Sequence, residues 1–190
     1  MNTVLHWTLP ALWIAWLAYW AIAARSTKET RRQESRSSRF SHYAPLIAGA
    51  VILGWPDILG AQLEQRFPGP LAVWLSLGVA LVALGLAFSA AARAKLGGNW
   101  SATITLKKDH ELIRGGPYAL VRHPIYTGML LAFFGSALAI GRWRALVGLA
   151  LLAAGLLRKM AIEERLMTEQ FGEAYARYRA EVPALIPFLI

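Results

Sequence analysis

The residues with the clearest potential for chemistry begin just before an apolar run in the second half of the chain. Segment 97–128 carries Arg122, His123 and Tyr126 and leads into an apolar helix that we predict to begin at Pro124. Proline suits the first turn of a helix because its missing N–H group would have no partner there. His123 therefore falls near the N-cap, where free N–H groups and the helix dipole favour an anion such as a carboxylate. Arg122 would add a bidentate partner for that anion.

Two adjacent carboxylates supply the opposite charge. Glu163 and Glu164 follow another apolar run, and Arg158 and Lys159 come just before them. Lys159 and Glu163 are four residues apart, so an amphipathic helix with an internal ion pair explains their spacing. Carboxylates at a membrane edge are nevertheless costly unless they are paired or used. With Glu163 near His123, the two would make a site with one anionic and one cationic pole, suited to a zwitterionic amino-acid group.

The composition predicts that these residues belong to an all-α membrane protein. Of 190 residues, 56% are hydrophobic and 16% are charged, and the mean hydropathy is +0.41. The net charge of +9 comes from basic residues between apolar runs, a pattern that argues against nucleic-acid binding. The absence of cysteine excludes disulfides, thiolate metal sites and cysteine nucleophiles, and the four histidines are too dispersed for a metal motif. We therefore expect no metal site.

The apolar runs predict about five transmembrane helices, since a bilayer core of about 30 Å needs roughly 20 apolar residues as helix. The last two should form a helical hairpin, and an amphipathic helix should follow at 158–179 on the cytoplasmic surface or at the interface. The sequence Trp-Pro-Asp at 55–57 should kink the second helix or end it early. The first run has no basic leader or cleavage site, so we expect it to be retained. The predicted spans are 4–24, 43–61, 70–92, 124–141 and 145–157.

The loop between the first two runs sets the expected orientation. Segment 25–42 is rich in Arg and Ser, and the positive-inside rule places it in the cytoplasm. The N-terminus would then be outside and the C-terminus cytoplasmic, in an inner or cytoplasmic membrane. This loop should also attract anionic lipid. The turn at 141–144 carries two arginines on the predicted outer side, against the rule. We expect residues 1–92 to supply membrane helices and residues 93–190 to form the cofactor-binding, catalytic region.

A series of short motifs in this second region follows a recognisable order. They are Gly116-Pro117-Tyr118, the run from Arg122 to Gly128 (RHPIYTG), Glu163-Glu164, Phe171-Gly172 with Tyr175 and Tyr178, and a tail with Val182-Pro183 and Ile186-Pro187. Over roughly 97–187 the chain resembles the isoprenylcysteine carboxyl methyltransferase family and its bacterial and archaeal relatives. The resemblance implies a helical membrane enzyme that binds S-adenosylmethionine on the cytoplasmic side and releases S-adenosylhomocysteine. Its lipophilic acceptor would enter from the bilayer.

The resemblance also implies roles for individual residues. Carried over by position, the cofactor contacts are Thr103, His110, Glu111, Leu112, Ile113, Tyr118, Arg122, His123, Pro124, Ile125, Tyr126, Glu163 and Glu164. The family can have Gln at the position of Thr103, whose side chain is shorter. Lys159 stands where the prenylcysteine enzymes place a substrate-facing Arg, and Arg158 precedes it. Lysine keeps the charge but lacks the bidentate fork. We therefore assign Lys159, Arg158 and Glu163 to the catalytic side of the site.

The function expected from these features is methyl transfer from S-adenosylmethionine to a lipophilic acceptor, such as a prenylcysteine carboxylate. A phospholipid amine and a small thiol remain open as acceptors. A sterol-type reductase using NADPH is a competing class, although several phosphates would call for more arginines than one loop supplies. A non-enzymatic membrane protein is a third class. A transporter would need ionisable residues inside its spans, and 4–24 and 70–92 contain almost none.

Overall fold

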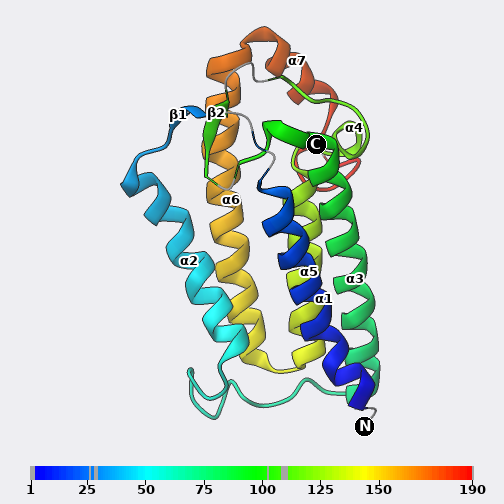
Figure 1. Cartoon of the computed structure of the whole chain (residues 1–190). Coiled ribbons are helices and arrows are strands. Elements are labelled where there is room, and N and C mark those ends of the chain that lie inside the picture. The colour runs from blue at the N-terminus through cyan, green and yellow to red at the C-terminus, as the bar shows by residue number, and fades with distance from the viewer. Residues whose placement is uncertain (1–2, 26, 28–29, 102, 108–110, 190) are drawn as a thin grey trace.

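Long helices lie side by side in the computed structural model, with a smaller cap at one end (Figure 1). The structure describes residues 3–25, 27, 30–101, 103–107 and 111–189. The long helices of this part are α1 (Thr3–Ala23), α2 (Arg36–Gly54), α3 (Leu71–Leu96), α5 (Pro124–Ile140) and α6 (Trp143–Phe171). The cap contains strands β1 (Thr30–Gln33) and β2 (Thr105–Lys107), the 3-10 helix η1 (Gly97–Asn99), and helices α4 (Pro117–Leu120) and α7 (Glu173–Glu181).

Most of the helical prediction is confirmed. The predicted runs 4–24, 70–92 and 124–141 correspond to α1, α3 and α5, and α5 and α6 form the predicted hairpin. By length and composition, two described segments are long and apolar enough to cross a membrane, Leu71–Asn99 and Trp143–Phe171. Trp7–Ala23 and Pro124–Ile140 are apolar but shorter. Five complete crossings therefore remain a prediction.

The predicted limits of the second run are wrong at both ends. Helix α2 begins at Arg36, inside the predicted basic loop, because the Ser35 side chain caps it by accepting a hydrogen bond from the Ser38 N–H group at 3.2 Å. The helix ends at Gly54, directly before Trp55 and Pro56, so the second apolar run stops seven residues earlier than 61. Only the possible early end at Trp-Pro-Asp was anticipated.

Helix α6 replaces two predicted elements with one. The predicted span 145–157 continues without a break into the charged segment and ends at Phe171, where Gly172 adopts a φ of 51° and α7 begins. A helix of 29 residues is about 43 Å long, so its charged second half projects beyond an apolar core of about 30 Å. The expectation of helices alone also missed the antiparallel pair β1–β2, which joins the loop after α1 to the linker after α3.

Glycines allow the helices to approach closely. A Cβ on Gly78 or Gly85 of α3 would collide with the backbone of Gly135 or Gly128 of α5, respectively. Small residues that bring helix backbones together are typical of membrane bundles. Helix α2 packs along α6 and α1 packs against α3. Val82, Leu86 and Ala132 form a core cluster on the α3–α5 pair, against which α1 lays a row of partly buried side chains (Leu9, Leu12, Trp13 and Trp16).

An ion cluster closes the end of the bundle opposite the cap. Glu64 Oε1 lies 2.6 Å from Arg144 Nε, and Glu64 Oε2 lies 3.2 Å from Arg142 Nη1. Arg144 also donates to the backbone oxygens of Ile52 and Leu53, at the end of α2. The two arginines that conflict with the positive-inside rule are therefore held by a carboxylate and by helix-end carbonyls.

Candidate functional site

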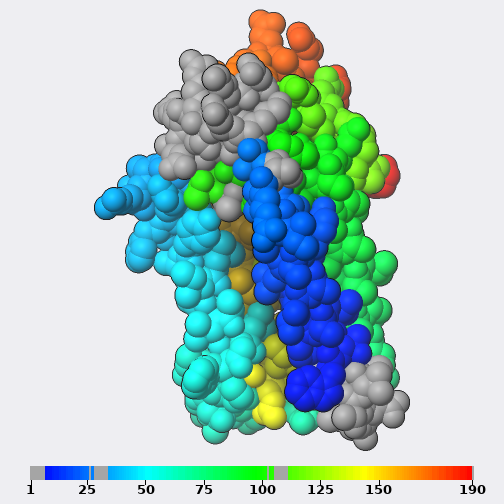
Figure 2. All heavy atoms as spheres, viewed as in Figure 1, coloured from blue at the N-terminus to red at the C-terminus, as the bar shows by residue number. Residues whose placement is uncertain are grey.

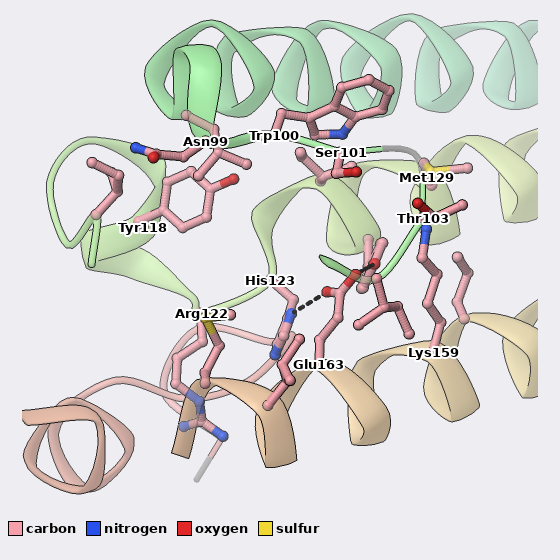
Figure 3. Close-up of a pocket in the computed structure, with 18 of the residues that line it drawn as sticks. Asn99, Trp100, Ser101, Thr103, Tyr118, Arg122, His123, Met129, Lys159 and Glu163 are labelled. Carbon is pink, nitrogen blue, oxygen red and sulfur yellow. Dashed lines mark hydrogen bonds and ion pairs between the residues drawn. The ribbon is translucent and has the colours of Figure 1, made fainter. Parts of the chain in front are cut away.

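A cavity of about 360 Å³ opens under the cap, a size within the usual range for small-molecule sites. Its walls come from the cap ends of α1, α2, α3, α5 and α6, from α4 and α7, and from the linker after α3. Figure 3 shows His123 and Glu163 directed toward one another, with Asn99, Trp100 and Tyr118 along the opposite wall. The cavity therefore collects side chains from both predicted regions of the chain.

The start of α5 places His123 at the N-cap, as predicted, and the His123 side chain lines the cavity. Pro124 occupies the first turn, and His123 is the N-cap residue with φ −121° and ψ 59°. The N–H groups of Arg122 and His123 donate to the carbonyl oxygens of Pro183 and Ala184, at 2.8 and 3.0 Å. These two donors are thus used by the C-terminal tail. The imidazole ring of His123 lines the cavity instead.

His123 lies between two carboxylates. Its Nε2 is 3.2 Å from Glu164 Oε1, and its Nδ1 is 3.8 Å from Glu163 Oε2, which is longer than a hydrogen bond. The Tyr126 ring is parallel to the imidazole at a centroid distance of 5.6 Å, and the Tyr126 hydroxyl donates to Glu163 Oε1 at 2.5 Å. Glu163 is therefore oriented through one oxygen, while its side chain remains 25% exposed beside the cavity.

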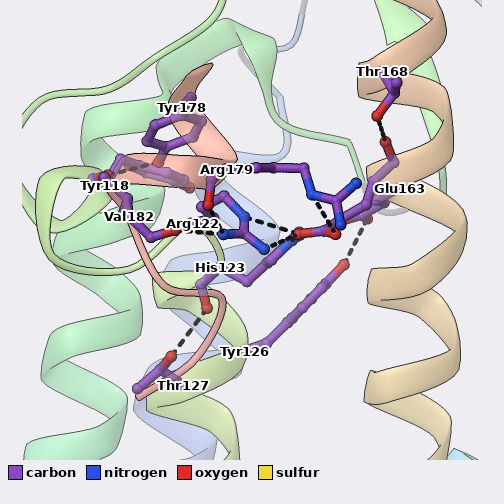
Figure 4. A network of polar contacts seen from close by, with 11 residues as sticks. Tyr118, Arg122, His123, Tyr126, Thr127, Glu163, Thr168, Tyr178, Arg179 and Val182 are labelled. Carbon is purple, nitrogen blue, oxygen red and sulfur yellow. Dashed lines mark hydrogen bonds and ion pairs between the residues drawn. The ribbon is translucent and has the colours of Figure 1, made fainter. Parts of the chain in front are cut away.

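The second carboxylate is bound by the protein itself. Glu164 Oε1 accepts from Arg122 Nε at 2.9 Å and lies 2.8 Å from Arg122 Nη2, and Glu164 Oε2 is 3.6 Å from Arg179 Nε (Figure 4). Burial favours the neutral carboxyl, but hydrogen bonds from His123 and Arg122 outweigh it and lower the pKa of Glu164 to about 2. Glu164 is thus an anion that holds Arg122 and His123.

The predicted cofactor residues separate into two groups. Arg122, His123, Tyr126 and Glu163 line the cavity, and so do Thr103, Glu111, Leu112, Ile113, Tyr118 and Ile125. Pro124 and Glu164 do not belong to the lining: Pro124 is buried in the first turn of α5 and Glu164 faces Arg122. His110 lies outside the described residues.

The structure distinguishes Lys159 from Arg158. Lys159 lines the cavity, with Nζ 5.8 Å from the centroid of the Tyr126 ring, within the range of a cation–π contact. Arg158 is exposed and is turned toward α2, with Nε 3.4 Å from Ser41 Oγ. Of the two basic residues that the sequence offered, Lys159 is the one at the site.

The tyrosines of the cap keep their protons at neutral pH. Burial raises the pKa of Tyr118 well above its usual range, and burial raises the pKa of Tyr178 to about 12. The Tyr178 hydroxyl donates to the backbone oxygen of Tyr118 at 2.6 Å, which ties α7 to α4. These rings give the cavity a neutral aromatic wall with hydrogen-bonding edges.

Sequence reasoning missed the contribution of the first two helices. Trp16 and Trp20 of α1 line the cavity, together with Tyr43 and Leu46 of α2. Trp20 meets Trp100 edge to face at a centroid distance of 5.8 Å. Trp13, Trp16 and Trp20 recur at intervals of three and four residues, which puts them on one helix face. This stripe of tryptophans is the feature of the sequence that could have predicted a role for the first helix at the site.

Comparison with known proteins identifies the family of the chain. The model of the phospholipid methyltransferase family matches residues 73–174, and the chain therefore belongs to that family. A protein-S-isoprenylcysteine O-methyltransferase from Schizosaccharomyces pombe is 29% identical over 132 residues, covering 65% of this chain and 56% of the relative. The protein of the same name from Homo sapiens is 31% identical over 120 residues, covering 61% and 42%, respectively.

A third relative is named for a different activity. Methanethiol S-methyltransferase 2 from Bradyrhizobium diazoefficiens is 40% identical over 72 residues, covering 38% of this chain and 27% of the relative. The matched regions span about half the length of the two isoprenylcysteine relatives. The resemblance drawn from the motifs is confirmed, and the family together with the apolar helices identifies a membrane protein.

Proposed function

We propose that the protein transfers a methyl group from S-adenosylmethionine to a lipophilic, anionic acceptor at the membrane surface. The observation that carries this proposal is one cavity with His123 and Glu163 facing each other and Lys159 one turn before Glu163 on α6. His123 offers a cationic pole and Glu163 an anionic pole for an amino-acid group. Lys159 offers a positive charge to a second reactant.

The residues present fit the donor. Glu163 can accept hydrogen bonds from an ammonium group, and His123 can bind the neighbouring carboxylate. The aromatic rings of Trp100, Tyr118 and Tyr178 suit a flat purine, and Asn99 lies among them as a polar partner. A cavity of about 360 Å³ with this lining matches a nucleoside joined to an amino acid in both chemistry and size class.

The chain's part in the reaction is to position the reactants and to exclude water. When bound, S-adenosylmethionine supplies an electrophilic methyl group on a sulfonium: the acceptor forms a new bond to that carbon, and the electron pair of the broken S–CH₃ bond stays on sulfur. His123 and Glu163 fix one end of the donor, which orients its methyl group. Lys159 lies near Leu156 and Tyr126, where it can attract an anionic nucleophile. The surrounding aromatic side chains keep water from competing.

A lateral route for the acceptor is consistent with the packing. Helix α2 packs on α6 and α1 packs on α3, and Figure 2 shows a groove between α1 and α2 with α6 at its base. Trp20, Tyr43 and Leu46 line the cavity where these helices meet the cap. We propose five crossings with the cap on the cytoplasmic side, and an acceptor whose apolar chain lies in this groove. Lipid would then deliver the acceptor to Lys159.

The acceptor class follows from charge. A phospholipid amine is cationic in its resting form and would be repelled by Lys159, whereas a carboxylate or a thiolate would be attracted. Because one relative is named as a thiol methyltransferase, a small thiol remains a second candidate acceptor.

The cavity is less suited to NADPH, because the guanidinium of Arg122 is already bound to Glu164. A purely structural protein would not be expected to have a cavity lined by His123, Glu163 and Lys159 together.

The test is a methyl-transfer assay in lipid nanodiscs with radiolabelled S-adenosylmethionine. The nanodiscs contain phosphatidylethanolamine, and three further acceptors are compared: a prenylated cysteine with a free carboxylate, its amide, and a small alkyl thiol. Products are identified by mass spectrometry. We expect transfer to the carboxylate or the thiol and none to the amide. Transfer to phosphatidylethanolamine in preference to both would contradict the anionic acceptor, and no transfer to any fraction would contradict the activity.

A further inference from the structure

The C-terminal tail after α7 contacts the very residues that begin α5. The carbonyl oxygens of Pro183 and Ala184 accept from the N–H groups of Arg122 and His123. The next carbonyl, of Leu185, accepts from Thr127 Oγ1 at 2.7 Å. Thr127 is about one helical turn farther along α5 than His123. The tail therefore runs down the outside of α5, from the cap toward the apolar part of the bundle.

The beginning of the tail is fixed by the Arg122–Glu164 pair. Arg122 Nη1 donates to the carbonyl oxygens of Arg179 and Val182 (Figure 4). Glu164 holds the same guanidinium through Nε and Nη2, at 2.9 and 2.8 Å. Glu164, which contacts His123 from α6, thus also holds the arginine that binds the start of the tail. Any movement of the tail would pull on the N–H group of His123.

The described end of the tail, residues 186–189, is strongly apolar. Ile186 is 58% exposed, Phe188 is 96% exposed and Leu189 is 65% exposed. No charged residue follows Glu181 as far as Leu189. Figure 2 shows this red segment on the flank of the bundle, below the top of the cap and level with upper turns of the long helices.

We propose that the tail is a strap anchored in the bilayer, with Ile186, Phe188 and Leu189 inserted among the lipid chains, and that this anchorage holds His123 in place. A second copy of the chain is a poorer occupant, because three side chains are far fewer than the roughly 20–30 residues a side of a stable interface. Exposed apolar side chains without charges, continuous with membrane-facing helices, fit an interfacial anchor. Only the consequence for donor binding rests on the proposed function; the depth of the tail does not.

The depth can be measured cleanly because the chain contains no cysteine. Phe188→Cys is labelled with a nitroxide in nanodiscs, and its collision rates with oxygen and with a water-soluble nickel complex are compared. Leu84→Cys, at a residue of α3 that is 63% exposed, is the membrane control. Glu173→Cys, at a side chain of α7 that is 95% exposed, is the aqueous control. We expect the Phe188 label, like the Leu84 label, to collide more with oxygen than with the nickel complex, at a shallower depth than Leu84. Behaviour like the Glu173 label, or spin–spin broadening between copies, would overturn the anchor.

The coupling to His123 is measured by calorimetric titration with S-adenosylhomocysteine. We expect Phe188→Asp and Thr127→Val each to weaken binding about fivefold in nanodiscs, and Phe188→Leu to bind like the parent. If the label lies in lipid but both variants bind like the parent, the tail does not position His123. If the parent itself does not bind, the proposed function fails while the depth measurement still decides the anchor.

Discussion

Glu64 lies between Arg142 and Arg144 at the closed end of the bundle, and Glu163 lies between His123 and Tyr126 at the cavity end. Both oxygens of Glu64 have basic partners within 3.2 Å, and Oε1 also accepts from the N–H group of Asp57 at 2.9 Å. Among the described residues, Glu163 has one hydrogen bond, from Tyr126, and its other oxygen is 3.8 Å from His123. A carboxylate that the protein saturates holds elements together, whereas one that it leaves partly satisfied beside a cavity can bind a ligand.

The largest expected effect is on stability, at the closed end. Glu64→Gln leaves Arg144, whose side chain is 6% exposed, without its counter-charge, and breaking a buried pair of this kind costs about 3 kcal/mol. We expect a clearly lower Tm in nanodiscs, followed by tryptophan fluorescence, with the affinity for S-adenosylhomocysteine within about twofold of the parent. A normal Tm combined with lost affinity would reverse the roles assigned to the two ends.

The matching substitution at the cavity end should lower the affinity for the donor and leave the stability unchanged. Glu163→Gln removes a charged acceptor from the site, and a hydrogen bond to a charged group is worth about 2 kcal/mol, or roughly 30-fold in affinity. Calorimetry should show this loss for S-adenosylhomocysteine while the Tm stays near that of the parent. Binding equal to the parent would remove Glu163 from the donor site.

A smaller effect separates the acceptor from the donor. Lys159→Gln should raise the KM for an anionic acceptor about tenfold, because one charge contact of roughly 1.4 kcal/mol is lost, with donor affinity unchanged. Arg158→Gln is the matched control, since that side chain faces Ser41 and not the cavity. An equal effect of the two substitutions would mean that only overall charge matters.

The smallest expected effect concerns pH. The pKa of Glu164 falls from 4.5 to about 2 in the folded protein, so its ion pairs stabilise the fold above pH 4.5 and lose this contribution as the pH falls toward 2. Between pH 5 and pH 3 the parent should lose about 1 kcal/mol more than Glu164→Gln, after allowance for solvent screening. Parallel acid-unfolding curves for the two proteins would contradict the assignment of Glu164 as a structural anion.

Local sequence signals predicted the parts of the molecule that depend on local physics. Pro124 set the start of α5 and therefore the position of His123, and hydropathy located α1, α3 and α5. The start of α2 could also have been predicted, since Ser35 is a typical N-cap residue, but the charge of the flanking arginines suggested a loop. Where charge and capping disagreed, capping determined the helix boundary.

Contacts between distant segments could not be read from periodicity. The β1–β2 pair depends on which loops the helices bring together, and the bond from Arg122 to Glu164 depends on how α5 and α6 are rotated. Arg122 was expected to bind a ligand anion, yet the fold supplies it with an internal carboxylate. The same rotation separates Lys159 from Arg158, which the sequence alone left equivalent.

The most direct test of the site is a calorimetric titration of S-adenosylhomocysteine into the parent, Glu163→Gln and Glu64→Gln proteins in nanodiscs, with NADPH titrated in parallel. We predict saturable binding of S-adenosylhomocysteine to the parent and to Glu64→Gln, a loss of about 30-fold for Glu163→Gln, and no binding of NADPH. Saturable binding of NADPH, or equal affinity of all three proteins for S-adenosylhomocysteine, would contradict the assignment of the cavity as a methyl-donor site.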